Sequence, residues 1–375
     1  TGLYLHIPFC KQSCHYCNFH FSTSQNNRDE VLTAINKEIN QKALGFKDKI
    51  STIYFGGGTP TILTEKELNT IIENILKKFD VKKNIEITVE ANPDDLTKSK
   101  LSALSNSVVN RISIGVQSFI DEELKSMNRA HDSKKAIKSI EMARKYFENI
   151  SIDILYGLPE SSLDSCNYNL DFIQKFDLNH ISAYALTIEP KTALQTFLKK
   201  SIIEMPDEQL VYDQFKLINE RLTNRGFINY EVCSFAKKDF FSQNNSAYWL
   251  RKKYIGIGPS AHSFDGNFRS WNISNNKKYI DQINQGLSYF KKEKLTRIDH
   301  YNEYIMTGLR TIWGISTEYI ESNFNANFKN YFLEKIQKHI VQKNVKIKNN
   351  VYLTTNSGRF LADGIASDLF LVNLK

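Results

Sequence analysis

Three cysteines are crowded into eight residues near the start of the printed sequence, in the stretch LHIPFCKQSCHYCNF. Cys10, Cys14 and Cys17 have C-x3-C-x2-C spacing, and the 375 residues contain only two further cysteines, Cys166 and Cys233. Neighbouring thiolates on one loop can bind zinc or an iron–sulfur cluster, whereas an odd number of cysteines is a poor basis for a disulfide scaffold. We expect Cys166 and Cys233 to be ordinary buried thiols.

An iron–sulfur cluster suits this spacing better than zinc does. Closed structural zinc sites take four ligands, and no fourth cysteine or pair of histidines stands at zinc-finger spacing. His6, His15 and His20 lie nearby but complete no usual pattern. A 4Fe–4S cluster held by three cysteines leaves one iron open to another ligand. We therefore expect a cluster with one non-cysteine position; the alternative is three unrelated thiols.

Short apolar strands alternate with helical patterns along the first half of the chain. The sequence predicts strands at 2–7, 51–57, 85–93, 111–119, 150–159 and 180–188. These strands are apolar on both faces, as in a covered parallel sheet. The pattern predicts an α/β fold with a partial (β/α)6 barrel over 1–195. Polar or glycine-rich residues end the strands, and such ends converge on the face that carries the active site.

The alternation of strands and helical patterns stops in the second half of the chain. We expect 196–298 to complete and connect the barrel, with a long helix over 207–225 and a polar loop further on. Helical patterns and a hairpin then predict a small winged-helix-like C-terminal domain over 299–375.

The composition bears mainly on whether the protein binds nucleic acids or membranes. The formal net charge is +8, and its lysines are spread in short clusters, which favours a solvated surface over nucleic-acid binding. Loose peripheral attraction to an anionic membrane stays open. No apolar run is long enough to span a bilayer, and the first twenty residues do not resemble a signal peptide. We expect a cytoplasmic protein.

The ordered motifs resemble the coproporphyrinogen dehydrogenase/HemW family of the radical S-adenosylmethionine (SAM) superfamily. They read LHIPFC…CHYCNF, YFGGGTPT, EANPDDLT, RISIGVQSF, IDILYGLP, NYEVCSFA and YIGIGPSAHSF. The likeness extends over nearly the whole chain, including the C-terminal domain. It implies a radical-SAM barrel in which Cys10, Cys14 and Cys17 hold a 4Fe–4S cluster whose open iron is chelated by SAM.

The resemblance also implies a set of SAM-contacting residues: Tyr4, Tyr16, Gly57, Gly58, Thr59, Glu90, Gln117, Arg129, Asp153 and, lining the same pocket, Ala185. The chemistry suits these types, because a carboxylate can accept two ribose hydroxyls and Arg can bind a carboxylate through two hydrogen bonds. Glycine lets the backbone approach a ligand closely. The alternatives are strand packing for the tyrosines, a surface position for Arg129 and plain core for Ala185.

Two departures point to the shorter HemW branch of this family. Phe19 stands where the dehydrogenase has a further cysteine, and only three residues precede Tyr4, where the dehydrogenase has a longer extension. By resemblance, this branch binds haem and passes it to haem proteins such as respiratory enzymes. The alternatives are a radical SAM oxidoreductase acting on coproporphyrinogen III or another porphyrin-type substrate, and an iron–sulfur protein that binds SAM without turnover.

A third departure concerns the haem ligand. The branch carries an H-N-x-x-Y-W motif associated with haem, and residues 244–249 here read NNSAYW. The Asn244 amide is a poor axial ligand for haem iron. Tyr248 and His262 are candidates, and Cys233 is a weaker one; the alternative for His262 is a loop histidine hydrogen-bonded to backbone. We expect Asn244→His to tighten haem binding.

Overall fold

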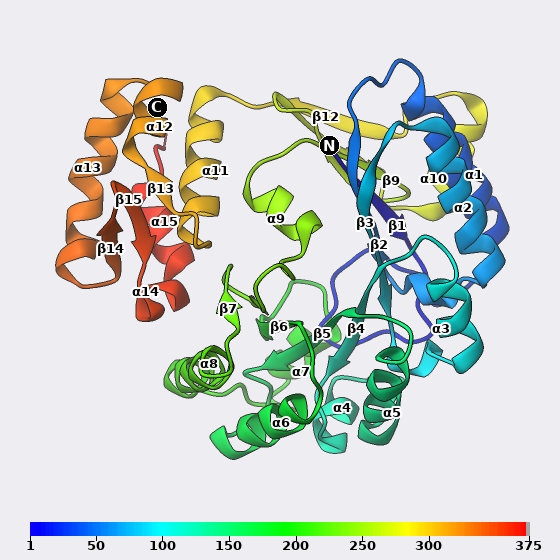
Figure 1. Cartoon of the computed structure of the whole chain (residues 1–375), viewed down its shortest axis with the longest axis horizontal. Coiled ribbons are helices and arrows are strands. Elements are labelled where there is room, and N and C mark those ends of the chain that lie inside the picture. The colour runs from blue at the N-terminus through cyan, green and yellow to red at the C-terminus, as the bar shows by residue number, and fades with distance from the viewer. Residues whose placement is uncertain (373–375) are drawn as a thin grey trace.

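In the computed structural model, which describes residues 1–372, a 12-stranded sheet forms the centre of the molecule (Figure 1). Its middle is parallel and consists, in spatial order, of β9 (Tyr254–Ile257), β1 (Gly2–Ile7), β2 (Ile50–Gly57), β3 (Val81–Ala91), β4 (Arg111–Gln117), β5 (Asn149–Tyr156) and β6 (His180–Ala185). Alternate residues of β1, such as Leu3 and Leu5, are fully buried, as expected for a strand covered by helices.

Antiparallel strands extend both edges of the sheet. One edge continues through β10 (His262–Phe264), β11 (Phe268–Asn272) and β12 (Phe290–Lys294), and the other through β8 (Ser234–Ala236) and β7 (Ile228–Asn229). Because β9 and β6 lie at opposite ends of the parallel part, the barrel is open, and the predicted fold class is confirmed. The structure adds β9 to the six predicted parallel strands, and β5 and β6 end earlier than predicted.

Helices cover the outside of the curved sheet, as Figure 1 shows for α1, α2 and α10 along one side. The bounds are α1 (Arg28–Ala43), α2 (Glu65–Lys78), α3 (Lys98–Ser105), α4 (Asp121–Ser126), α5 (Ser133–Ala143), α6 (Leu163–Lys175), α8 (Glu208–Thr223) and α10 (Asn276–Gln285). Shorter elements are η1 (Pro60–Ile62), η2 (Pro93–Asp95), α7 (Ala193–Lys199) and α9 (Gln243–Trp249). The amphipathic pattern explains the packing: α2 buries Leu68, Ile71, Ile72 and Ile75 on one face.

Helix α9 occupies a stretch where the sequence predicted a polar loop, so that prediction is wrong. The helix begins with two favourable contacts at its N-terminus. The Ser242 hydroxyl accepts the Asn245 N–H at 3.3 Å, and the Glu86 carboxylate accepts the N–H groups of Gln243 and Asn244, each at 3.1 Å. A cap and a negative charge at this end stabilise a helix whose own residues are weak helix formers.

The C-terminal unit forms its own core beside the barrel, near α9 in Figure 1. It contains α11 (Arg297–Leu309), α12 (Thr317–Asn323), α13 (Ala326–Val341), α14 (Asn356–Phe360) and α15 (Ala362–Leu369) around the antiparallel strands β13 (Ile315–Ser316), β15 (Val351–Thr354) and β14 (Val345–Lys348). The sequence predicted one helix after the hairpin, and the structure has two. The domain limits at 195 and 298 stay predictions, and 373–375 lie outside the described residues.

A buried arginine links the C-terminal unit to the barrel. The Arg359 guanidinium donates to the backbone oxygen and the side-chain oxygen of Asn229 on β7, at 2.5 and 2.6 Å. The Ile312 N–H donates to the Tyr230 carbonyl at 3.0 Å nearby. Within residues 1–372, no helix combines the length and apolar character needed to cross a membrane.

Candidate functional site at the open end of the barrel

The three predicted cluster ligands lie on the loop between β1 and α1. Backbone hydrogen bonds hold this loop, from the Cys10 N–H to the Ser22 carbonyl at 3.0 Å and from the Cys17 N–H to the Cys14 carbonyl at 3.3 Å. Burial and, to a smaller extent, negative charge on Cys17 and Cys14 raise the pKa of the Cys10 thiol to about 12. The three thiols therefore lie close enough for the charge on one to affect the pKa of another.

Within the described residues, no three His, Cys, Asp or Glu side chains are drawn together closely enough to hold a single metal ion. A 4Fe–4S cluster makes a different demand, because each cysteine bonds a different iron. That Cys10, Cys14 and Cys17 hold such a cluster stays a prediction. Burial raises the pKa of Cys10 and Cys17 and so favours their protonated thiols, and a bound metal centre must displace these protons.

Arg129 stands beside the cysteine loop and supplies positive charge to it. Its Nη1 lies 3.2 Å from the Cys14 sulfur and 3.4 Å from the Tyr16 hydroxyl, and its Nη2 donates to the Asn92 side-chain oxygen at 2.8 Å and to the Gly115 carbonyl at 2.7 Å. The buried Nε has no hydrogen-bond partner among residues 1–372. The two Nη atoms therefore make all of the hydrogen bonds that hold this guanidinium beside the loop.

Two carboxylates belong to the same sheet, Glu90 near the carboxyl end of β3 and Asp153 within β5. The Tyr54 hydroxyl donates to Glu90 at 2.7 Å, and the Ser113 hydroxyl lies 3.4 Å from both oxygens of Asp153. Burial and, to a smaller extent, the Asp153 charge raise the pKa of Glu90 to about 7, and burial raises the pKa of Asp153 to about 6. The buried Arg111 opposes both shifts. Such carboxylates can accept hydroxyl groups of a polar ligand.

Gly57 and Gly58 have an intrachain reason to be glycine. Gly57 has φ +109, and a Cβ there would lie 2.7 Å from the His6 ring. A Cβ on Gly58 would lie 2.5 Å from the Phe9 carbonyl oxygen. At both positions it is the protein's own chain, His6 or Phe9, that leaves no room for a side chain. The expectation that these glycines let a ligand approach the backbone stays a prediction.

The other predicted SAM-contacting residues lie along the same end of the barrel. The Tyr4 hydroxyl is 3.2 Å from His6 Nδ1, and the Thr59 hydroxyl is 3.5 Å from the Cys10 sulfur. Gln117 ends β4 with φ +68, where the pairing with β5 is irregular, and Ala185 ends β6. Their roles toward SAM stay predictions.

Sequence reasoning missed several polar residues that hold this arrangement together. Asn92 contacts Arg129 directly and lies 3.4 Å from the Thr59 hydroxyl. Tyr54 and Ser113 hold the two carboxylates. Asn92 could have been found, because it directly follows β3 in EANPDD, at a strand end. Nothing in the sequence marks Tyr54 or Ser113, since both read as ordinary strand residues.

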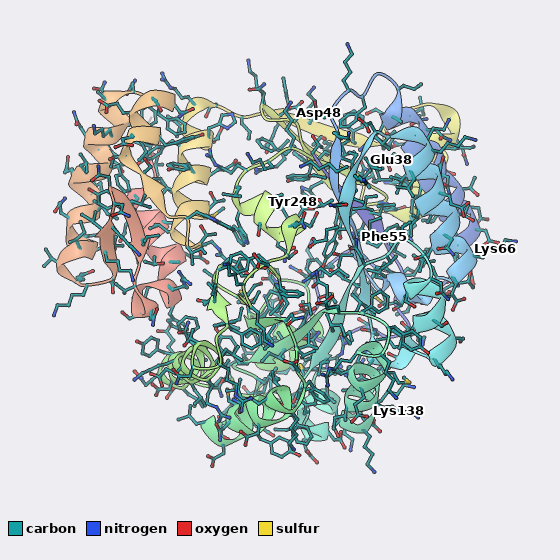
Figure 2. The ribbon with its side chains drawn as sticks, viewed as in Figure 1. Glu38, Asp48, Phe55, Lys66, Lys138 and Tyr248 are labelled. Carbon is teal, nitrogen blue, oxygen red and sulfur yellow. The ribbon has the colours of Figure 1, made fainter. Side chains whose placement is uncertain are left out.

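A cavity of about 510 Å³ opens beside the cysteine loop. Residues 18–20 directly after Cys17, together with β1, α9, β9, β10 and α11, form its walls. Its lining is rich in aromatic side chains, including Tyr4, Phe19, Tyr248, Tyr254 and Phe264. Figure 2 shows Tyr248 between the C-terminal helices and the sheet. Tyr4 links this cavity to the barrel interior, because a Cβ on Gly56 would meet both Tyr4 and Glu90.

Asn244 does not line this cavity. Its side chain is only 2% exposed and accepts a hydrogen bond from the Thr52 hydroxyl on β2 at 3.1 Å. An imidazole at this position would be directed into packed protein. The expectation that Asn244→His supplies a haem ligand is therefore not supported by the geometry.

Comparison with known proteins agrees with this architecture. Residues 4–173 match the Radical SAM superfamily model, and residues 295–361 match the HemN C-terminal domain. The chain is 34% identical to the "Heme chaperone HemW" of Bacillus subtilis (strain 168), over 96% of this chain and 97% of that protein. The chain belongs to the HemW family. The HemW of Lactococcus lactis (strain IL1403) is 30% identical over 97% and 98% of the two chains.

A solved structure of another protein has a fold similar to that of this HemW family member. Coproporphyrinogen III oxidase (HemN) from Escherichia coli aligns with a TM-score of 0.85, over 98% of this chain and 89% of that one. Its sequence identity is 24%, so this likeness concerns the fold.

Proposed function

We propose that this chain is a haem chaperone that holds a 4Fe–4S cluster and SAM at the open end of its barrel, binds haem in the neighbouring cavity, and passes it to haem-accepting proteins such as respiratory enzymes. The observation that carries the proposal is the aromatic cavity of about 510 Å³ beside the cysteine loop. Its size is typical of a small-molecule site, and its flat aromatic walls suit a planar macrocycle.

In this proposal Cys10, Cys14 and Cys17 hold the cluster. When bound, such a cluster supplies an electron that can cleave a carbon–sulfur bond of SAM. Arg129 would supply positive charge to the carboxylate of SAM, while Glu90 and Asp153 would accept its hydroxyl groups. Haem is the cargo, held outside this centre and available for transfer.

One observation favours a second candidate function, a radical SAM oxidoreductase acting on coproporphyrinogen III or another porphyrin-type substrate. Tyr4 lines the cavity and also lies beside the barrel interior that contains Glu90. A macrocycle in the cavity would then lie close to SAM. The third candidate is an iron–sulfur protein that binds SAM without turnover.

Anaerobic incubation of the cluster-loaded protein with SAM and dithionite distinguishes these functions. A haem chaperone should bind haem stoichiometrically and form no more 5′-deoxyadenosine when coproporphyrinogen III is added. Substrate-dependent 5′-deoxyadenosine would establish the oxidoreductase instead. Failure to bind haem, with no turnover, would leave the iron–sulfur protein. The cytoplasmic location, loose membrane association and lack of a nucleic-acid partner stay predictions.

A further inference from the structure

His262 has free donor atoms in the wall of the aromatic cavity. It lies on β10, and its ring stacks beside Trp271 with centroids 6.2 Å apart and planes 25° apart. No hydrogen bond within residues 1–372 occupies either ring nitrogen, so the backbone-bonded alternative is not what the structure shows. Burial lowers the pKa of His262, and the nearby Arg269 lowers it further, so the neutral imidazole is favoured. Neutral imidazole is the form that binds iron.

The other donors around this cavity are less suited to iron. Both ring nitrogens of His6 are engaged, one with the Tyr4 hydroxyl and the other with the His20 carbonyl at 2.7 Å. His20 Nε2 lies 2.7 Å from the Asn276 side-chain oxygen, which leaves a single free nitrogen. Burial raises the pKa of Tyr248, which disfavours the phenolate that would bind iron.

Positive charge and apolar surface lie around the same cavity. Arg251 forms no ion pair with any residue of the described chain; it lies over Tyr304 at 4.6 Å and over Tyr319 at 5.1 Å. Its Nη2 donates to the Tyr319 hydroxyl at 2.9 Å, so the aromatic rings fix the guanidinium at the cavity wall. Phe19 is 69% exposed and Met306 is 37% exposed, and both line the cavity.

Each of these features suits a different part of the haem molecule. A macrocycle would cover the exposed Phe19 and Met306, an iron needs a neutral nitrogen donor, and a propionate needs a cation. Arg269, by contrast, is already paired with Glu303 at 2.5 Å. The unpaired Arg251 is therefore the better partner for a propionate.

We propose that His262 is the axial ligand to the iron of haem bound in this cavity, and that Arg251 binds a haem propionate. This inference rests on the proposed haem-binding function. It places the iron ligand on β10 rather than on α9, where Asn244 stands.

The test compares haem with iron-free protoporphyrin IX, using the full cluster-loaded chain and titration by absorbance and fluorescence. His262→Ala should weaken haem binding about tenfold or more and remove the imidazole-type Soret and resonance Raman signature, while the affinity for protoporphyrin stays unchanged. Added imidazole should restore the signature in this variant, which shows that the cavity has kept its fold. His300→Ala, which changes a histidine of α11 outside the cavity lining, is the matched control.

The propionate contact is tested with haem dimethyl ester. Arg251→Gln should weaken binding of haem several-fold and leave binding of the ester unchanged. The inference is overturned if His262→Ala keeps the wild-type signature, if His20→Ala loses it instead, or if Arg251→Gln affects haem and its ester equally. Wild-type protein that binds neither haem nor protoporphyrin would refute the proposed function itself, which is a distinguishable result.

Discussion

Arg129 is the residue on which the candidate site depends most. It connects the cysteine loop, through Cys14 and Tyr16, to β4 and to the turn after β3, through Gly115 and Asn92. A guanidinium can serve five acceptors in a fixed planar geometry, so one side chain can orient three segments. Its sequence context, KSMNRAHD, gives no sign of this burial.

The cluster prediction is tested by replacing one of its ligands. Cys14→Ala should abolish the 4Fe–4S absorption, and the wild type should hold about four irons per chain after reconstitution. Cys166→Ala is the control, because this buried thiol belongs to α6, away from the cysteine loop, and its loss should leave the iron content unchanged. Full iron content in Cys14→Ala, or stoichiometric zinc in the wild type, would contradict the account.

The partly buried carboxylates Glu90 and Asp153 give the cluster-free protein a characteristic pH dependence. Their pKa values are raised to about 6 for Asp153 and about 7 for Glu90, whereas unfolded carboxyls titrate near 4. Between these values the native state binds more protons than the unfolded state, so the free energy of unfolding falls as pH rises from about 4 to about 7.

Asp153→Asn should remove the Asp153 share of this pH dependence, which is on the order of 2–3 kcal/mol between about pH 4 and 6. Urea unfolding at several pH values measures it. Asp171→Asn, at a largely exposed carboxylate, should keep the wild-type slope. An unchanged slope in Asp153→Asn would mean that the pKa of this carboxyl is not raised in the folded protein.

At the scale of elements, the turn after β2 is fixed by close packing. Gly57→Ala should destabilise the fold by roughly 2–4 kcal/mol, because the new Cβ meets the His6 ring in a left-handed backbone conformation. Gly45→Ala is the matched control: it has φ +72 but nothing within 4 Å of a Cβ, so it should cost only about 1 kcal/mol. Chemical denaturation measures both. Equal effects would show that packing against His6 adds nothing.

The sequence predicted the parallel strands and main helices well because their apolar periodicity is strong and local. It failed where an element depends on distant residues. Helix α9 needs Glu86, which is far away along the chain, to accept its first N–H groups. The cavity depends on α11 facing the cysteine loop, and no local pattern reports that contact. For the same reason, the sequence could match Asn244 to a motif but could not show that its side chain is buried against β2.

At the scale of the molecule, the docked C-terminal unit supplies one wall of the cavity. Arg359→Met should remove its hydrogen bonds to Asn229 and cost about 1–3 kcal/mol, because a buried carbonyl loses its partner. We expect faster proteolysis between the barrel and α11, together with weaker haem binding. Lys335→Met, at an exposed ion pair with Glu334, should change neither. If Arg359→Met is proteolysed at the wild-type rate and binds haem with the wild-type affinity, then docking depends on other contacts.

Transfer of haem to a haem-free acceptor tests the central claim most directly. The cluster-loaded chain is saturated with haem, freed of excess ligand, and mixed with a haem-free respiratory enzyme while the spectra of both proteins are followed. The account predicts that haem leaves the chain and appears in the acceptor, that the acceptor gains activity, and that no 5′-deoxyadenosine needs to form. Haem that stays with the chain while the acceptor remains haem-free would contradict a chaperone function.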